Sequence, residues 1–171
     1  MKTETSSFRL EKEVFTEFKR HAKKQNLSVN SLINKVMKEY VEWGAHLPAI
    51  QQIPISASLI GTFLKGHNEK QIRNFAKEHT EIHMVENLLM VKNEESLEAF
   101  LEGVQNWCNS AGFPISSKEK NGSTNYTVMH HQGMKFSILL EEMIKTTIEI
   151  LTKEKAKIKH TTNAISFWIR Q

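Results

Sequence analysis

The chain has 171 residues, of which 39% are hydrophobic and 25% are charged, values that suit one ordinary globular domain or two small ones. Its net charge of +4 favours a polyanionic partner, and the first 44 residues hold nine basic and six acidic side chains, which is most of that excess. All 19 acidic residues are Glu, which excludes Ser-His-Asp triads and the Asp-dependent sites of kinases, P-loop proteins and EF-hands, so we expect no enzyme.

The first element in the chain is a predicted strand over residues 5–10. Phe8 and Leu10 alternate with Ser7 and Arg9, so that apolar side chains occupy one face and polar side chains the other. A lone strand of this length leaves its backbone groups unpaired and cannot bury its apolar face. The strand therefore requires a second copy of itself, and we expect an obligate dimer.

Two amphipathic helices are predicted after the strand. The first runs from Lys12 to about Lys24 and the second from Ser28 to about Trp43, each with apolar residues at helical spacing. Asn26 tolerates the left-handed conformation that ends a helix, and Ser28 can cap the next one.

Residues 5–43, TSSFRLEKEVFTEFKRHAKKQNLSVNSLINKVMKEYVEW, resemble the ribbon-helix-helix family that includes the Arc and methionine repressors. The resemblance rests on the alternation that ends in Leu10, the turn Asn26-Leu27-Ser28 and the segment Ser31-Leu32-Ile33. It implies a dimer whose two-stranded ribbon enters the major groove of duplex DNA, which has room for such a ribbon. Asn26 departs from the family, which usually has Gly at this position.

The resemblance also assigns roles to individual residues. Arg9 would read guanine, because a guanidinium can contact O6 and N7 together. Amides at the start of the second helix would hold a phosphate, a role that helix N-termini also favour on physical grounds. The expected base-reading residues are Thr5, Ser7 and Arg9, the phosphate-contacting residues are Ser28, Val29 and Asn30, and the dimer core consists of Phe8, Leu10, Leu32, Ile33 and Val36.

A second domain is expected after a linker. Gly44 ends the first domain, residues 1–44, and Pro48 and Pro54 mark residues 45–54 as the linker to a domain over residues 55–171. This domain should begin with helices over residues 56–65, 68–79 and 81–91. A further helix, capped by Asn93, should end at Gly112 and Pro114.

The remainder of the second domain is predicted to be a small α+β unit. Asn121-Gly122 predicts a two-residue hairpin turn between strands 115–120 and 123–130. A helix over residues 135–153 and a strand within residues 158–169 follow. The order strand, strand, helix, strand makes the whole chain an α+β protein, with a dimeric N-terminal arm and a C-terminal α+β domain.

These features predict a sequence-specific regulator of transcription that acts as a homodimer or tetramer on double-stranded DNA. The second domain would sense a small-molecule effector or join dimers. We expect a cytoplasmic, nucleoid-associated protein without a membrane span, because the apolar stretches are far shorter than about 18 residues, the N-terminus lacks a secretory signal, and a single cysteine, Cys108, suits a reducing compartment.

Several alternatives remain open at the level of sequence. For residues 5–43 the alternative to a ribbon-helix-helix arm is an ordinary helical hairpin with a frayed N-terminal tail. Nickel-responsive regulators also join such an arm to an α+β domain, and His130, His131 and His160 are the candidate ligands, although no His-x-His spacing occurs and we expect no bound metal or other cofactor. Antitoxins and plasmid-accessory proteins use the same arm. His130, His131, Glu141 and Glu142 are the densest set for an enzyme, but the two Glu residues are more typical of a solvated helix face.

Overall fold

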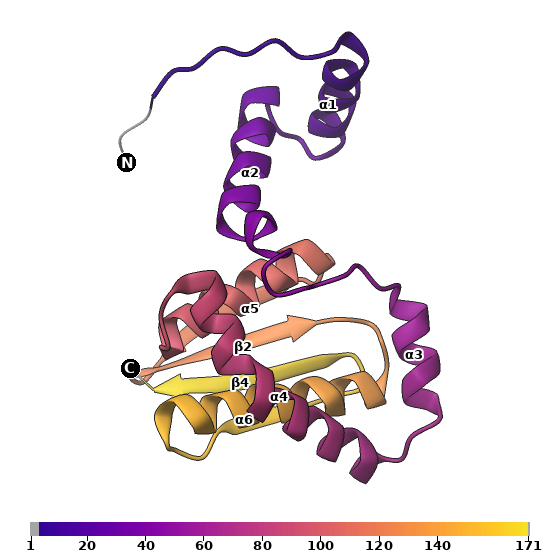
Figure 1. Ribbon diagram of the computed structural model, residues 1–171, viewed down its shortest axis with the longest axis vertical. Coiled ribbons are helices and arrows are strands. Elements are labelled where there is room, and N and C mark those ends of the chain that lie inside the picture. The colour runs from indigo at the N-terminus through magenta and orange to yellow at the C-terminus, as the bar shows by residue number, and fades with distance from the viewer. Residues whose placement is uncertain (1–3, 171) are drawn as a thin grey trace. The chain divides into compact units, whose positions relative to one another are not determined.

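The chain divides into two compact units, with the boundary between Gly44 and Ala45. The computed structural model describes residues 4–170, so residues 1–3 and 171, at the outer ends of the two expected domains, lie outside the described part. The described residues form six α-helices and one four-stranded antiparallel sheet (Figure 1), which confirms the α+β class. We call residues 4–44 unit 1 and residues 45–170 unit 2.

Unit 1 contains two helices and no strand. Helix α1 spans Lys12–Lys24 and helix α2 spans Val29–Glu42, as the apolar spacing predicts. The strand expected over residues 5–10 is absent from the single chain, because residues 4–11 adopt no regular structure. The physical reason is that the segment has no neighbouring strand with which to exchange backbone hydrogen bonds.

The turn between α1 and α2 has the predicted chemistry. Asn26 has a φ of 54°, in the left-handed region, and the Leu27 amide donates to the Ala22 carbonyl at 2.9 Å to close α1. Ser28 then caps α2, because its hydroxyl accepts a hydrogen bond from the Ser31 amide at 3.0 Å.

The helices of unit 2 differ from the prediction in two places. Residues expected to form two short helices form one, α4, over Glu69–Lys92, because no Gly or Pro interrupts the segment. Asn93, with a φ of 52°, ends α4 instead of capping the next helix, which Ser96 caps. The other helices of unit 2 are α3, Ala57–Lys65, α5, Leu97–Ala111, and α6, Met134–Thr152. A short 3₁₀ helix, η1, Gly44–His46, begins at the last residue of unit 1.

The sheet has four strands in the order β1-β2-β4-β3. The predicted hairpin is confirmed, with positive φ at both Asn121 and Gly122. The single last strand expected within residues 158–169 is instead a second hairpin, closed by a hydrogen bond from the Thr161 amide to the Ala164 carbonyl at 2.8 Å. The strands are β1, Ile115–Lys120, β2, Ser123–Met129, β3, Lys157–His160, and β4, Ala164–Arg170.

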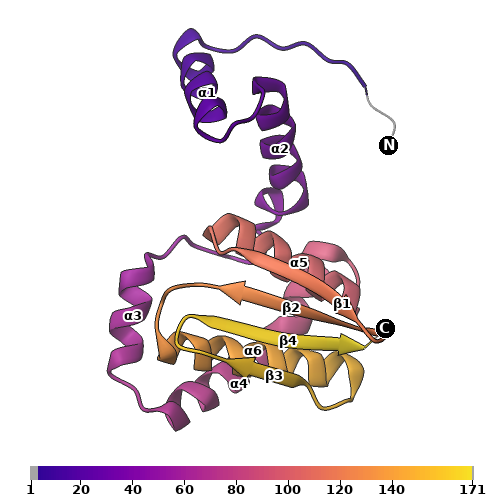
Figure 2. The ribbon, with the colours of Figure 1, turned by 180° about the vertical axis from the view of Figure 1, so that it is seen from behind.

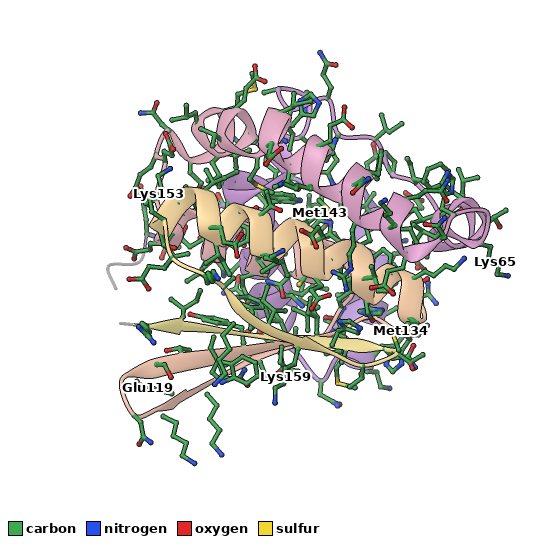
Figure 3. The ribbon with its side chains drawn as sticks, turned by 90° about the horizontal axis from the view of Figure 1, so that it is seen from below. Lys65, Glu119, Met134, Met143, Lys153 and Lys159 are labelled. Carbon is green, nitrogen blue, oxygen red and sulfur yellow. The ribbon has the colours of Figure 1, made fainter. Side chains whose placement is uncertain are left out.

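Helices α5 and α6 cover one face of this sheet, and the strands lie in front of them when the molecule is seen from the opposite side (Figure 2). Ile165 and Phe167 on β4 and Val128 on β2 are buried beneath the helix layer and join the core with α6. Figure 3 shows the sheet edge on, with α6 between the strands and α4. No helix in the part of the chain that the structure describes is long and apolar enough to cross a membrane.

Candidate nucleic-acid interface

The three predicted base-reading residues lie in the segment that precedes α1. Thr5, Ser7 and Arg9 are all exposed, and no regular element of the single chain orients them. The apolar residues that alternate with them are also exposed, with 53% of Phe8 and 46% of Leu10 accessible. The segment therefore presents both its polar and its apolar side chains to solvent.

Unit 1 leaves an extensive apolar surface uncovered. Among residues 4–44 the buried hydrophobic side chains are those of Ala22, Leu32 and Trp43. Of the predicted dimer core, Leu32 is buried and Ile33 is half-buried, whereas Val36 is 43% exposed. The exposed large apolar side chains of the unit are Phe8, Leu10, Val14, Phe15, Leu27, Val36, Met37, Tyr40 and Val41.

The predicted phosphate-contacting residues form the first turn of α2. The backbone amides of this turn have no acceptor within the helix, and Ser28 satisfies the amide of Ser31. Val29 is half-buried and Asn30 is exposed. The free amides and the helix dipole together suit an anion at this position.

His130, a candidate metal ligand, is instead a buried structural residue. Its Nδ1 accepts a hydrogen bond from the Gln132 amide at 3.0 Å, and its Nε2 lies 2.9 Å from Ser137 Oγ. Ser137 donates its own proton to the Thr161 carbonyl at 2.6 Å, so it accepts from Nε2. Both ring nitrogens are therefore occupied in the neutral form, and burial followed by the charge of His131 lowers the pKa of His130.

His160, the third candidate ligand, pairs with a carboxylate. Its Nδ1 lies 3.1 Å from Glu141 Oε2, which Arg73 also approaches at 2.8 Å. The Arg73 contact is an ion pair, and the His160 contact becomes one only when the imidazole is protonated; neither Glu141 Oε2 nor His160 Nδ1 has hydrogen-bond geometry with a partner. Arg73 also contacts Glu69 at 2.9 Å and Glu142 at 3.1 Å.

This charge cluster was missed at the level of sequence. Glu142 was expected on a solvated helix face, but only 7% of its side chain is exposed. Burial alone would lower the pKa of Arg73, but Glu69, Glu141 and Glu142 together raise it, so the guanidinium stays charged. No local pattern reveals the cluster, because Arg73 and Glu142 are 69 positions apart in the chain.

The structure does not bring the candidate metal ligands together. His131 is exposed, His130 is bonded to Ser137, and His160 is paired with Glu141. Within residues 4–170, no three His, Cys or Glu side chains converge in a way that could hold a metal ion. Cys108 is fully buried, and burial raises the pKa of its thiol to about 12, in keeping with the small apolar residue that its helix position predicts.

Unit 2 has a recess at one end of its sheet. Its volume is about 720 Å³, within the range of small-ligand pockets. Lys155, Lys157 and Arg170 line it together with a single acidic residue, Glu154, and the ring of Trp168 forms part of its wall. The recess is therefore basic and partly aromatic.

The sequence matches no protein-family model and no curated protein.

Proposed function

We propose that this chain is a cytoplasmic regulator of transcription that binds duplex DNA sequence-specifically as a dimer. In the proposed dimer, residues 4–11 of two copies pair antiparallel as a ribbon in the major groove, and four helices pack beneath it. One observation carries the proposal: unit 1 joins an unpaired, alternating segment to two helices whose apolar residues remain exposed.

The energetics of unit 1 favour a second copy. Only three hydrophobic side chains are buried within residues 4–44, and units of about 40 residues usually need a partner, a metal or disulfides to fold stably. Phe8, Leu10 and Val36 are each between 43% and 53% exposed. Full burial of such a side chain contributes about 1.5–3 kcal/mol, so pairing offers several kcal/mol from these three residues in each copy.

Pairing would also create the reading surface. When two alternating segments form a ribbon with their apolar faces on the helices, Thr5, Ser7 and Arg9 of both copies project from the opposite face. The helix start at Ser28–Asn30 would then hold a backbone phosphate on each side. Phosphate contacts fix the register of the protein, and the ribbon reads the bases.

For unit 2 we propose a role in joining dimers. A row of rings crosses α3 and α4, with centroid distances of 4.4 Å from Phe63 to His67, 6.0 Å from Phe63 to Phe75, 6.1 Å from Phe75 to His79 and 4.9 Å from His79 to His83. Phe63 and Phe75 are each about half exposed. Exposed apolar patches of this kind often mark contacts between proteins, which supports assembly into a tetramer.

The test is a duplex-binding experiment with one charge-matched control. The wild-type protein selects its preferred sequence from a pool of random duplexes, and affinity for that duplex and for a scrambled one is measured by fluorescence anisotropy. We expect Arg9→Ala to lower affinity for the selected duplex by about 5- to 150-fold, which corresponds to 1–3 kcal/mol, with little effect on the scrambled duplex. Arg20→Ala, which removes an exposed Arg paired with Glu17 on α1, should leave the preference intact.

Two outcomes would contradict the proposal. One is that the pool yields no preferred duplex, even at low salt where phosphate contacts are strongest. The other is that Arg9→Ala and Arg20→Ala lower the affinity for both duplexes by the same factor. Arg9 would then contribute only through the net charge of the protein.

A further inference from the structure

One face of the sheet of unit 2 carries basic side chains and no acidic ones. Residues 45–171 contain 14 basic and 13 acidic residues, so this part of the chain is nearly neutral. Five of the 14 basic residues, and none of the 13 acidic ones, occupy the face that the helices leave uncovered. We call this surface the open face.

Strand alternation and register define the open face. Ile165 and Phe167 are fully buried beneath the helices, so the positions between them on β4 and their partners on the other strands point the opposite way. Two contacts agree with this assignment: Thr127 Oγ1 lies 2.8 Å from Ser166 Oγ, and the Lys157 ammonium lies 5.0 Å from the centre of the Trp168 ring. The open face consists of Ser116, Lys118 and Lys120 on β1, Ser123, Asn125, Thr127 and Met129 on β2, Lys157 and Lys159 on β3, and Ala164, Ser166, Trp168 and Arg170 on β4.

The basic residues of the open face have no carboxylate partner among residues 4–170. Lys118, Lys120, Lys157, Lys159 and Arg170 are exposed, and none is in an ion pair within the described part of the chain. A second copy cannot pack this face against itself without opposing like charges. The complementary partner is therefore a polyanion.

We propose that the open face of unit 2 binds single-stranded nucleic acid. Lysines lie on both edge strands, with Lys118 and Lys120 on β1 and Lys157 and Lys159 on β3, and the two rows are separated by three strand spacings, about 14 Å. Such rows can neutralise the phosphates of a strand laid across the sheet. This surface lies in a different unit from the proposed duplex-reading ribbon and does not depend on it.

The centre of the open face favours a single strand over a duplex. Trp168 is half-buried on the inner strand β4, and the Lys157 ammonium lies over one face of its ring. Beside it are polar side chains, those of Asn125, Thr127 and Ser166, which hydrogen-bond to one another and to the Phe167 carbonyl. Bases of a single strand can stack on an aromatic ring, whereas a duplex keeps its base faces stacked internally. A duplex would therefore make no use of this centre.

Protection of the sheet edges against unwanted pairing explains only some of the basic residues on the open face. Lysines on edge strands discourage unwanted pairing between sheets, which accounts for the residues of β1 and β3. It does not account for Arg170 and Trp168, which lie on an inner strand. Both of these residues also line the basic recess at the end of the sheet, which is large enough to admit a terminal nucleotide.

The charge test compares two double variants of the full-length protein with equal changes in net charge. Binding of fluorescein-labelled 20-residue oligo(dT) and oligo(U) is measured by anisotropy at several salt concentrations. We expect Lys118→Gln/Lys159→Gln to weaken binding at least tenfold at low salt and to reduce the log-log salt slope by about 1.4, because two phosphate contacts are lost. Lys65→Gln/Lys70→Gln, exposed on α3 and α4, should change affinity less than twofold.

The stacking test targets Trp168. Trp168→Leu should weaken oligo(dT) binding by about 5- to 100-fold, the effect of removing one stacked base, while Trp168→Phe retains most of the affinity. Unchanged circular dichroism and urea midpoints of both variants would show that unit 2 remains folded. Retained affinity for the selected duplex would separate this proposal from the role of Arg9. The comparison of oligo(dT) with oligo(U) distinguishes DNA from RNA as the preferred strand.

Three results would overturn the proposal. The first is equal loss of oligonucleotide binding in the two lysine double variants, which would indicate a net-charge effect only. The second is undiminished oligonucleotide affinity after Trp168→Leu. The third is that Lys118→Gln/Lys159→Gln weakens duplex binding but not single-strand binding, or changes the oligomeric state, because the open face would then serve a duplex or a second copy.

Discussion

His130 is held in one protonation state by its surroundings. Its Nδ1 accepts from the Gln132 amide and its Nε2 donates to Ser137, so a second ring proton would face the Gln132 N–H. Because burial lowers the pKa of His130 in the folded chain, the unfolded chain binds more protons at mildly acidic pH. The stability that this residue contributes is thus present above the unfolded pKa of about 6.5 and is lost as pH falls through the lowered folded value.

The expected outcome is a free energy of unfolding that falls with decreasing pH below about 6.5, by at most about 1.4 kcal/mol per pH unit from this one group. His130→Gln should reduce that dependence, at the expense of lower stability at neutral pH. The measurement is urea denaturation between pH 7.5 and 5.0. His131→Asn is the comparison variant, since this exposed neighbour has a φ of 54° that Asn tolerates. It removes only the smaller cause of the lowered His130 pKa, so it should reduce the pH dependence less than His130→Gln, and an equal reduction would contradict the assignment.

At the scale of an element, the backbone conformation of the residue that ends a helix affects stability. Gly112 ends α5 with a φ of 70°, whereas Lys153 ends α6 with a φ of 59°. The left-handed region costs an ordinary L-residue about 1–2 kcal/mol and costs glycine almost nothing.

Two substitutions at these ends should therefore have opposite effects. Lys153→Gly should raise the free energy of unfolding by up to about 1 kcal/mol, and Gly112→Ala should lower it by about 1 kcal/mol. A Cβ at Gly112 would meet no atom within 4 Å, so its cost arises from the backbone angle and not from a clash. Urea midpoints at unchanged slope measure both effects, and a shift of the same sign in the two variants would refute this explanation.

Arg73 on α4 forms ion pairs with two residues of α6. It lies 2.8 Å from Glu141 and 3.1 Å from Glu142, and the Glu142 carboxylate is nearly inaccessible to water. Arg73→Met removes the guanidinium and leaves Glu142 paired only with Lys145 at 3.2 Å. We expect a loss of about 3 kcal/mol in the free energy of unfolding, the lower end for breaking a buried pair.

The matched control for Arg73→Met is Lys77→Met, on the same helix. Lys77 pairs with Glu81 at 3.7 Å on the surface, where such pairs contribute less than about 1 kcal/mol. Equal losses in the two variants would mean that the Arg73 cluster does not hold the helices together.

Elements governed by local chemistry were predictable from sequence, and those governed by distant contacts were not. Asn121-Gly122 determines the first hairpin, because these two residues readily adopt the positive φ angles that the turn requires. Asn26-Leu27-Ser28 likewise determines the turn between α1 and α2, because Asn26 adopts a positive φ and Ser28 supplies the cap. Glu142, by contrast, is buried by a partner 69 positions away. The division of residues 157–170 into two strands also depends on pairing with β2, which the local pattern does not encode.

The candidate sites also combine features that a local pattern predicts with features that depend on distant contacts. The lysines of the open face alternate with period two in both β1 and β3, a pattern visible in Lys118-Glu119-Lys120 and Lys157-Ile158-Lys159. Their convergence on one surface, however, requires the strand order β1-β2-β4-β3 and its register. The sequence pattern could place each pair on a strand face but could not bring the pairs to the same face.

At the scale of the whole molecule, the account rests on two copies of residues 4–11 forming a ribbon. In one copy these residues have no regular structure, and unit 1 buries few of its apolar side chains. A ribbon would give alternate amides in this segment hydrogen-bond partners on the second chain. The same pairing would cover Phe8 and Leu10, so ribbon formation and dimerisation should occur together.

Hydrogen-deuterium exchange of the full-length protein tests this claim most directly. At micromolar or higher concentration we expect alternate amides within residues 5–10 to exchange far more slowly than those of an unstructured peptide, and protection should fall as dilution dissociates the dimer. Phe8→Asp, which opposes burial of the segment, should abolish the protection while the amides of α6 remain protected. Exchange of residues 5–10 at unstructured rates at every concentration, with selected duplex DNA present or absent, would contradict the ribbon.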